Sequence, residues 1–424
     1  MKHFFNFILF SITLLFIFQN FSCSRNQTIT TLKEEKLFTL KYGKYENELQ
    51  LFNLANLGNI NTKIFMKDGF FFIADDNAKK IMEMTSYGDL LGIIYNPETN
   101  PEPSFVRNIK NTKGSSTATT EEFSQNTITQ TAQKHLFNQI SNISANSEKN
   151  IFVVDQISQE RQEQDLQTKT ILKEVVLRFT NDGKFIDYIG QEGPGGTPFP
   201  FIKDIFVTKN NELIVTCITN EGYSVHWFNS VGFLKYTIPI KTESIPLVKD
   251  EYDMDSTEYF VTIDKIIPDS TKQKLYIKTD YHKTVIDTES NVQSGIEYYQ
   301  TLLHPLNVEN GQFEESLVIP PYEDVVTDGF SKLTYNTAFD FLGVTESGWF
   351  FFMIPDNTGY VIQMIQPNGQ RIIKRHINYN RDKTVYQNFT LSDNGIISSL
   401  LATNENASVV WWRTDTLIES IYSK

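Results

Sequence analysis

A single pattern recurs along the chain: four short apolar strands joined by turns that contain Asp, Asn or Gly. The first copy runs through Thr62–Met66, Phe70–Ala74, Lys80–Met84 and Leu90–Tyr95, with its first turn at Asp68-Gly69. Strands rich in β-branched and aromatic residues, separated by such turns, are typical of a meander of hairpins. One such unit cannot bury both faces of its sheet, so its repetition constrains the fold more than any other feature.

The unit occurs six times. The last interval between second strands, from Trp349 to Ile396, is 47 residues, which matches a propeller blade of about 40–50 residues. Longer intervals need insertions, and two polar segments supply them, residues 96–134 and 156–172. The predicted second strands begin near Phe70, Ile151, Glu212, Leu275, Trp349 and Ile396.

Six such sheets packed radially share a core and leave only short edges. We therefore predict an all-β protein, a six-bladed β-propeller with four-stranded antiparallel blades, over residues 37–424. Leu37–Phe52 could supply a strand that closes the ring against the last blade, although the sixth unit already offers four strands, the last at Leu417–Tyr422. Two stacked β-sandwiches are the alternative, but they do not require the same strand order six times.

A glycine-rich run, Gly190–Gly196, stands just before the strand Ile202–Val207. A phosphate-binding P-loop needs Gly-Lys-Ser/Thr leading into a helix, so we interpret this run as a connection between blades. Together with Phe71–Asp75, Lys80 and Gly88, it resembles NHL-type and YWTD-like β-propeller repeats. In the NHL family a Gly-rich stretch leads into the next inner strand, and an Asp ends the second strand.

Acidic residues at the ends of second strands recur with the unit. A carboxylate at such a position accepts hydrogen bonds from the N–H groups of a turn. A specific site would break the repeat rather than follow it, so we predict a structural role for these residues. They are Asp75, Asp155, Asp280 and Asp356.

The N-terminus has the layout of an export signal, with a charged start, an apolar run over Phe4–Phe21 and small residues at its exit. Cys23 at that exit resembles the acceptor of a bacterial lipoprotein signal, where cleavage before the cysteine leaves an acylated, palmitate-bearing N-terminus. Asn20 replaces the usual aliphatic residue, as spirochaetal lipoproteins tolerate. We predict a signal peptide over residues 1–22 and a polar tether over 23–36; an ordinary signal peptide or an uncleaved anchor is the alternative.

The formal net charge is −13 at pH 7. No basic field would steer such a chain to nucleic acid or anionic lipid, so we predict neither as a direct partner. If Cys23 carries lipid, Cys217 is left alone and no intrachain disulfide forms. Cys217 ends an apolar run and is expected to be a small buried hydrophobe; the alternative is a nucleophilic thiol with His226 as its base.

No pattern of a known catalytic or metal centre is present. The six histidines are scattered, and neither a Gly-x-Ser-x-Gly elbow nor an intact Asp box occurs. We therefore predict no catalytic residue, no metal ligand and no cofactor. Some six-bladed propellers are calcium-dependent lactonases, so a calcium-dependent hydrolase remains an alternative.

Signal and repeat together resemble the propeller lipoproteins of spirochaetes and, by fold-level analogy, the propeller lipoprotein of the outer-membrane β-barrel assembly machinery. The resemblance implies a lipid-anchored, non-enzymatic scaffold on the periplasmic side of the outer membrane, with envelope proteins as partners. Strand addition to a blade edge is a mode that fits. A propeller that binds a small ligand or glycan in its channel is the main alternative.

Overall fold

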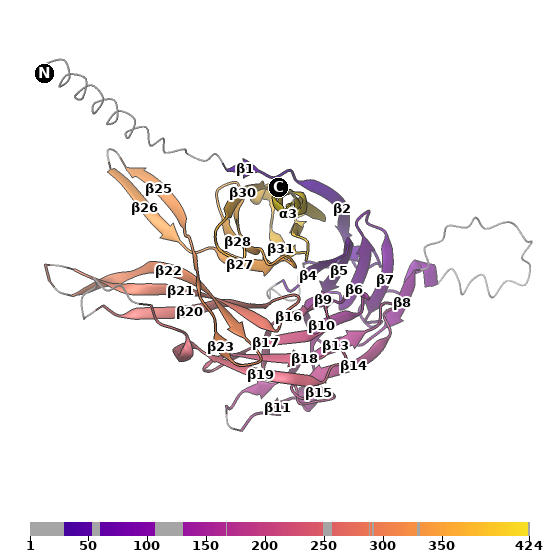
Figure 1. Cartoon of the computed structure of the whole chain (residues 1–424). Helices are drawn as coiled ribbons and strands as arrows, with labels where there is room; N and C mark the ends of the chain where they lie inside the picture. Colours follow the sequence, from indigo (N-terminus) through magenta and orange to yellow (C-terminus); the bar gives the residue numbers. More distant parts are fainter. Residues whose placement is uncertain are drawn as a thin grey trace, which may run out of the picture.

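The computed structural model describes residues 29–52, 60–106, 130–166, 168–248, 257–287, 289–290, 292–328 and 331–422. Six sheets stand around a common axis, and the predicted all-β, six-bladed propeller is confirmed (Figure 1). The predicted signal peptide and Cys23 lie outside the described residues. Among the described residues, no helix is long and apolar enough to cross a membrane.

The first three blades follow the predicted strand order, from the inner strand outward. Blade 1 holds β4 (Lys63–Lys67), β5 (Phe70–Asp75), β6 (Lys80–Thr85), β7 (Leu90–Tyr95) and the parallel strand β8 (Thr131–Lys134). Blade 2 holds β9 (Ile140–Ala145), β10 (Ile151–Gln156), β13 (Glu174–Phe179), β14 (Phe185–Gly190) and β15 (Gly193–Pro194). Blade 3 holds β16 (Phe201–Val207), β17 (Leu213–Thr219), β18 (Gly222–Phe228) and β19 (Leu234–Lys241).

The last three blades contain more irregular elements. Blade 4 holds β20 (Tyr259–Pro268), β21 (Lys274–Ile286), β22 (Gln293–Asn307), β23 (Gln312–Phe313) and β24 (Leu317–Ile319). Blade 5 holds β27 (Asp340–Val344), β28 (Phe350–Pro355), β29 (Gly359–Ile365), β30 (Ile372–Asn378) and β1 (Thr30–Thr31). Blade 6 holds β31 (Tyr386–Leu391), β32 (Ile396–Ala402), β33 (Asn406–Arg413), β2 (Glu35–Tyr42) and β3 (Glu48–Leu49).

Small elements lie between the blades and within blade 2. A separate hairpin of β25 (Tyr322–Asp328) and β26 (Ser331–Thr337) joins blades 4 and 5. The polar segment predicted over residues 156–172 contains a short pair of strands, β11 (Glu163–Gln164) and β12 (Ile171–Leu172). Three 3-10 turns are η1 (Gln159–Arg161), η2 (Thr242–Ser244) and η3 (Arg381–Lys383).

The N-terminal strand β2 closes the ring. It pairs antiparallel with β33, with Leu40 opposite Ala407. Because β2 occupies the fourth place in blade 6, the fourth strand predicted at Leu417–Tyr422 was wrong: these residues belong to the helix α3 (Asp415–Tyr422). Ile418 is buried in the core between blades 5 and 6, so the apolar side of the helix packs against the ring.

The predicted tether over residues 23–36 reaches into this closure. Thr30–Thr31 form β1 and pair in parallel with Arg375–His376 of β30, and β2 begins at Glu35. The described chain is thus hydrogen-bonded to the ring from Thr30 onward.

The hydrophobic core is divided into six clusters, each between two neighbouring blades. In β28, Phe351 and Met353 face blade 6, whereas Phe350 and Phe352 face blade 4. Successive side chains of a strand point to opposite faces, so a run that is apolar at every position is buried on both sides. This explains the continuous aromatic run at Trp349–Phe352 without any binding role.

Candidate functional site

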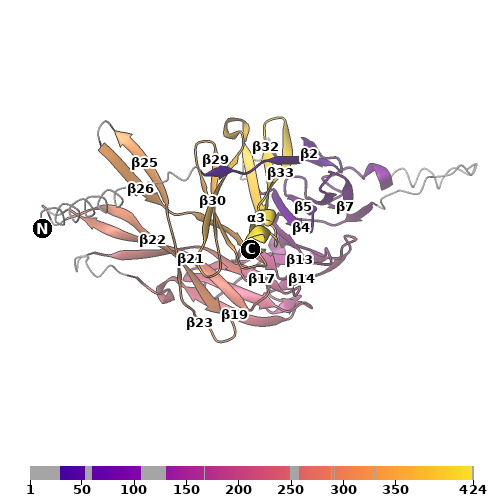
Figure 2. The ribbon, with the colours of Figure 1, turned by 45° about the horizontal axis from the view of Figure 1, so that its top comes forward.

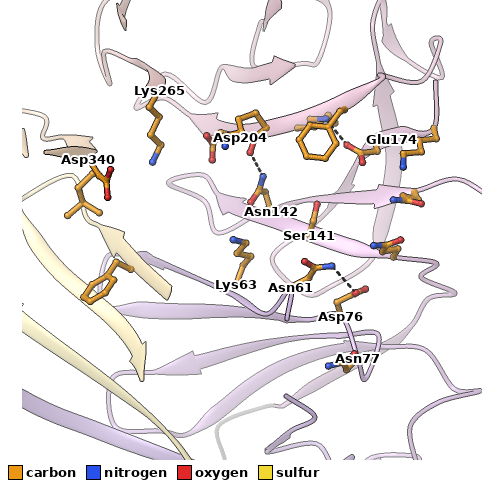
Figure 3. Close-up of a pocket in the computed structure, with 18 of the residues that line it drawn as sticks. Asn61, Lys63, Asp76, Asn77, Ser141, Asn142, Glu174, Asp204, Lys265 and Asp340 are labelled. Atoms are coloured by element: carbon orange, nitrogen blue, oxygen red, sulfur yellow. Dashed lines mark hydrogen bonds between the residues drawn. The ribbon is translucent and has the colours of Figure 1, made fainter. Parts of the chain in front are cut away.

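A cavity of about 980 Å³ opens at one mouth of the ring, where the inner strands converge (Figure 3). Its wall is built mainly from the inner strands and the segments that enter them, and from the turn that follows β5. All six blades contribute, with most of the lining residues coming from blades 1, 2, 3 and 5. Residues that line it include Asn61, Lys63, Asp76, Ser141, Asn142, Lys203, Asp204, Asp264, Lys265, Asp340 and Phe389.

Bulges in the inner strands aim extra side chains into the cavity. In blade 3 the pairing with β17 shifts between Ile202 and Asp204, so Lys203 is the extra residue. In blade 4 the shift falls between Ile263 and Lys265. A regular strand would turn consecutive side chains to opposite faces, but a bulge bends the strand and re-aims them. Lys203 and Asp204 therefore both line the cavity, as do Asp264 and Lys265.

Three lysines from three blades share this space: Lys63 of β4, Lys203 of β16 and Lys265 of β20. Figure 3 shows the side chains of Lys63 and Lys265 extending toward each other across the cavity, beside Asp204. Burial lowers the pKa of Lys63, and the two other lysines lower it further while Asp204 opposes them. Burial raises the pKa of Asp204 against the effect of the same three lysines.

The neighbouring carboxylates form no ion pair with this cluster. Asp264 accepts a hydrogen bond from the Phe341 N–H at 3.2 Å and forms an ion pair of 3.0 Å with Lys278. Burial and the charge of Asp264 raise the pKa of Asp340, against the effects of Lys278 and Lys265. Asp204 is the carboxylate on which Lys63, Lys203 and Lys265 all act.

The remaining wall is polar, with the charged residues Asp76, Lys79, Lys173 and Glu174 and some apolar surface. The amide of Asn142 donates to the Lys203 carbonyl at 2.7 Å, and the Asn61 amide lies 3.5 Å from the Asp76 carboxylate. Phe201, half exposed, and Phe341 add ring surface to the lining. A polar lining with a few aromatic side chains is typical of small-molecule sites.

The repeated aspartates do not line the cavity; two of them hold the chain that enters an inner strand. Asp75 accepts hydrogen bonds from the N–H groups of Gln50, at 2.7 Å, and Ala78, at 3.2 Å. Asp155 accepts from the N–H of Gln139 at 2.7 Å. Burial raises the pKa of Asp155 to about 6, although its backbone hydrogen bonds act in the opposite direction.

The other two aspartates differ from this arrangement. Asp356 accepts from the N–H groups of Thr358 and Gly359 in its own turn, at 2.9 and 2.8 Å. Asp280 does not end a strand as predicted, because β21 continues to Ile286. It accepts instead from the ammonium of Lys278 at 2.7 Å.

Other residues that the sequence singled out lie away from the cavity. Cys217 is fully buried between blades 2 and 3, and burial raises the pKa of its thiol, which is the opposite of what a nucleophile needs. The run Gly190–Gly196 folds back as β14 and β15 and leads to β16, so it connects blades as expected. Within the described ranges, no three His, Cys, Asp or Glu side chains gather as a metal site.

Sequence reasoning missed the lysine cluster. A signal for it exists, since the inner strands contain the segments Lys63-Ile64-Phe65, Lys203-Asp204-Ile205 and Asp264-Lys265-Ile266. A lysine just before an apolar run recurs in these three copies but not in all six. A charged residue shared by only some copies of a repeat points to a site rather than to the scaffold.

Two β-arms project beside the cavity mouth on one side of the ring (Figures 1 and 2). The blade 4 arm consists of Tyr259–Ile263, Tyr281–Ile286 and Gln293–Gln300, which extend its three long strands. The hairpin arm is β25 with β26. Asp264 and Lys265 directly follow the blade 4 arm, and Asp340 follows β26, so both arms are rooted at the cavity wall.

The arms expose apolar side chains. On the blade 4 arm, 59% of Ile296 and 40% of Phe260 are exposed; on the hairpin arm, 54% of Tyr335 and 49% of Leu333 are exposed. The hairpin arm forms a two-stranded sheet of its own. An isolated two-stranded sheet is marginally stable in water, so the apolar surface and free strand edges of this element are unusual for a ring that stands alone.

Comparisons with known proteins give no family for this chain. No protein-family model and no curated protein sequence matches it. Similar solved structures include a gluconolactonase from Xanthomonas campestris, with 10% identity and a TM-score of 0.33 over 81% of this chain and 82% of that one. Hydrazine synthase of Kuenenia stuttgartiensis has 8% identity and a TM-score of 0.37 over 84% of this chain and 98% of that one. The Dos1 propeller has 8% identity and a TM-score of 0.37 over 90% of this chain and 95% of that one. Likenesses this distant bear on neither activity nor site residues.

Proposed function

We propose that this protein is a non-enzymatic scaffold, anchored in the cell envelope by a lipid on Cys23, that binds other envelope proteins through its two arms. The observation that supports it best is the exposure of both arms beside one mouth of the ring. Ordering a residue costs about 1–2 kcal/mol of backbone entropy. Arms that bury little of their own surface gain little free energy to offset this entropy cost, unless a partner covers them.

The hairpin arm is suited to binding by strand addition. Its two strands pair only with each other within the described chain, so each presents an outer edge of N–H and C=O groups. Natural proteins usually cover or interrupt such edges, because they are templates for pairing with another chain. An extended segment of a partner that adds to this edge gains main-chain hydrogen bonds, and contacts with Leu333 and Tyr335 provide selectivity.

The charge of the hairpin arm indicates which kind of partner it would bind. The hairpin arm carries three acidic residues and one lysine. On the blade 4 arm, Glu297 pairs with Lys283 at 3.9 Å. Complementary charge speeds encounter and suppresses wrong partners. The proposed partner segment is therefore basic and extended. Unfolded strands of outer-membrane proteins on the periplasmic side are the specific candidates.

The proposed anchor would hold the arms close to a membrane. From Cys23 to Thr30, where the hydrogen-bonded chain begins, there are seven residues. Each residue of an extended chain spans at most about 3.6 Å, so the ring lies within roughly 25 Å of the lipid. Because this segment is so short, the arms would reach only proteins that lie at the same membrane.

The arms can be tested by photo-crosslinking in cells. A benzophenone amino acid is placed at Tyr335 and, separately, at Ile296; the control position is Tyr87, which is 86% exposed at the β6–β7 turn. That turn lies at the end of β6 away from the cavity, since Lys79 lines the cavity just before β6 begins. We expect the same envelope protein to be linked from both arm positions and not from Tyr87. Absence of arm-specific adducts would refute the docking role.

The anchor is tested separately with Cys23→Ser. We expect the wild-type protein to sediment with membranes and Cys23→Ser to remain in the soluble fraction, because one residue supplies the whole lipid attachment. A Cys217→Ser variant serves as the control, since Cys217 is buried in the core. A Cys23→Ser protein that still sediments with membranes would contradict the lipid anchor but leave the docking test unaffected.

A further inference from the structure

The three cavity lysines lack the partners that lysines usually have. In the part of the chain that the structure describes, Lys63, Lys203 and Lys265 have no carboxylate within 4.0 Å and no hydrogen bond from their ammonium groups. By contrast, Lys278, which contacts the lining residue Asp264, is paired with two carboxylates. The cluster stands out further in a chain whose net charge is −13.

Bringing these lysines together costs free energy. Like charges that share a partly desolvated space repel each other, and the effect is stronger than in water because the local dielectric is lower. The charges of Lys63, Lys203 and Lys265 all act on Asp204, and Asp264 is paired with Lys278 and accepts a hydrogen bond from the Phe341 N–H. None of these three ammonium groups forms an ion pair with a described carboxylate, so a negatively charged group placed among them would be attracted by all three.

The cavity has the size and lining for a small molecule. Its volume of about 980 Å³ is at the upper end of the range typical for ligand sites, about 300–1,000 Å³. Beside Lys63, the wall offers the Asn61 amide and the hydroxyl group of Ser141. These groups suit the hydroxyls of a ligand, while the half-exposed ring of Phe201 can cover its apolar face.

We propose that this cavity binds a small polyhydroxylated molecule that carries one oxyanion group, a carboxylate or a phosphate. The oxyanion lies among Lys63, Lys203 and Lys265, and its hydroxyls face Asn61 and Ser141. This site is independent of the scaffold function, because the docking surface lies on the arms and the ligand lies inside the ring.

Isothermal titration calorimetry on the purified full-length protein tests the proposal with three probes. Glucuronate carries a carboxylate, glucose 6-phosphate carries a phosphate, and glucose carries neither. We expect at least one anion to bind at least about tenfold more tightly than glucose, a difference worth about 1.4 kcal/mol. Affinity should fall as salt is raised, since screening weakens the contacts. The stronger of the two anions identifies the oxyanion.

Variants locate the site. Lys63→Gln combined with Lys265→Gln should weaken binding of that anion at least about tenfold, in a protein whose urea unfolding midpoint shows that it is folded. Lys272→Gln removes one lysine charge from an exposed turn of blade 4 and should leave affinity unchanged. The proposal is overturned if neither anion binds at millimolar concentration, if glucose binds as well as both anions, or if the folded double variant keeps wild-type affinity.

Discussion

The ammonium group of Lys278 lies 3.0 Å from the carboxylate of Asp264. The same ammonium contacts Asp280 at 2.7 Å, and the Lys278 side chain is only 1% exposed. Asp264 belongs to the inner strand and lines the cavity, whereas Asp280 stands where the blade 4 arm leaves the ring. One buried lysine therefore ties the cavity wall to the root of the arm.

Lys278→Met is expected to destabilise the protein by about 3–5 kcal/mol, because it leaves two carboxylates in partly buried places without their cation. The matched control is Lys209→Met, which removes an exposed pair with Glu346 and should cost far less, because water screens exposed ion pairs. Urea unfolding of the two variants measures the difference. Equal losses would show that burial adds nothing to the Lys278 pair.

The closure of the ring by β2 gives a second prediction. Leu40 is buried between blades 6 and 1, and Lys41, its neighbour on the same strand, is exposed. Leu40→Ala should cost about 2–5 kcal/mol in unfolding free energy, whereas Lys41→Ala should change it by no more than about 0.5 kcal/mol. If the two variants unfold at the same urea concentration, β2 does not seal the ring.

The repeat made most of the fold predictable from sequence. The second strands predicted at Phe70, Ile151 and Ile396 begin at those residues, because each copy places an apolar strand after a turn at the same point. The last element could not be assigned in this way. Leu417–Tyr422 is short and apolar, and periodicity alone does not separate a short helix from a strand. The pairing of β2 with β33 joins opposite ends of the chain, and local sequence patterns do not reveal such a long-range contact.

The candidate site was less predictable, because it exists only when the ring is closed. Lys63, Lys203 and Lys265 are far apart in sequence, and bulges in two of the three strands decide where their side chains point. The arms could not be predicted from the sequence, for a related reason. The blade 4 strands run past Asp280, where the repeat would end them, and no turn residue in the sequence marks that continuation.

Gly190 gives a third prediction, which concerns the role of the glycine-rich run. A Cβ at Gly190 would overlap the backbone carbonyl of Gly196, an atom that cannot move without shifting the chain. Gly190→Ala should therefore cost about 1–3 kcal/mol, as overpacking against backbone does. Gly295→Ala is the control, since its Cβ would meet nothing within 4 Å. Comparable unfolding midpoints for the two variants would contradict the close packing of this connection.

The final prediction concerns pH. His226 packs edge-on against Phe199, with ring centroids 5.1 Å apart, and burial lowers its pKa to about 4, against the opposing effects of Gln191 and Glu192. The unfolded chain takes up this proton near pH 6.5. The buried neutral imidazole thus contributes stability that is complete above pH 6.5 and is lost as the pH falls toward 4. The loss amounts to about 3 kcal/mol at most.

Asp155 acts in the opposite direction over much of the same range. Its folded pKa of about 6 lies above its ordinary value of 3.8, so its contribution to stability increases as the pH falls through 6.

A pH profile of the wild type alone would mix the two effects. His226→Phe keeps an aromatic ring and removes the titration of this residue; it also removes the 3.2 Å hydrogen bond with Ser224, whose loss is common to the three pH values. The difference in unfolding free energy between His226→Phe and wild type should therefore grow in favour of the variant as the pH is lowered from 7 to 4. Urea unfolding at pH 7, 5.5 and 4 measures it, and a difference that stays constant across the three pH values would show that His226 is not held neutral by burial.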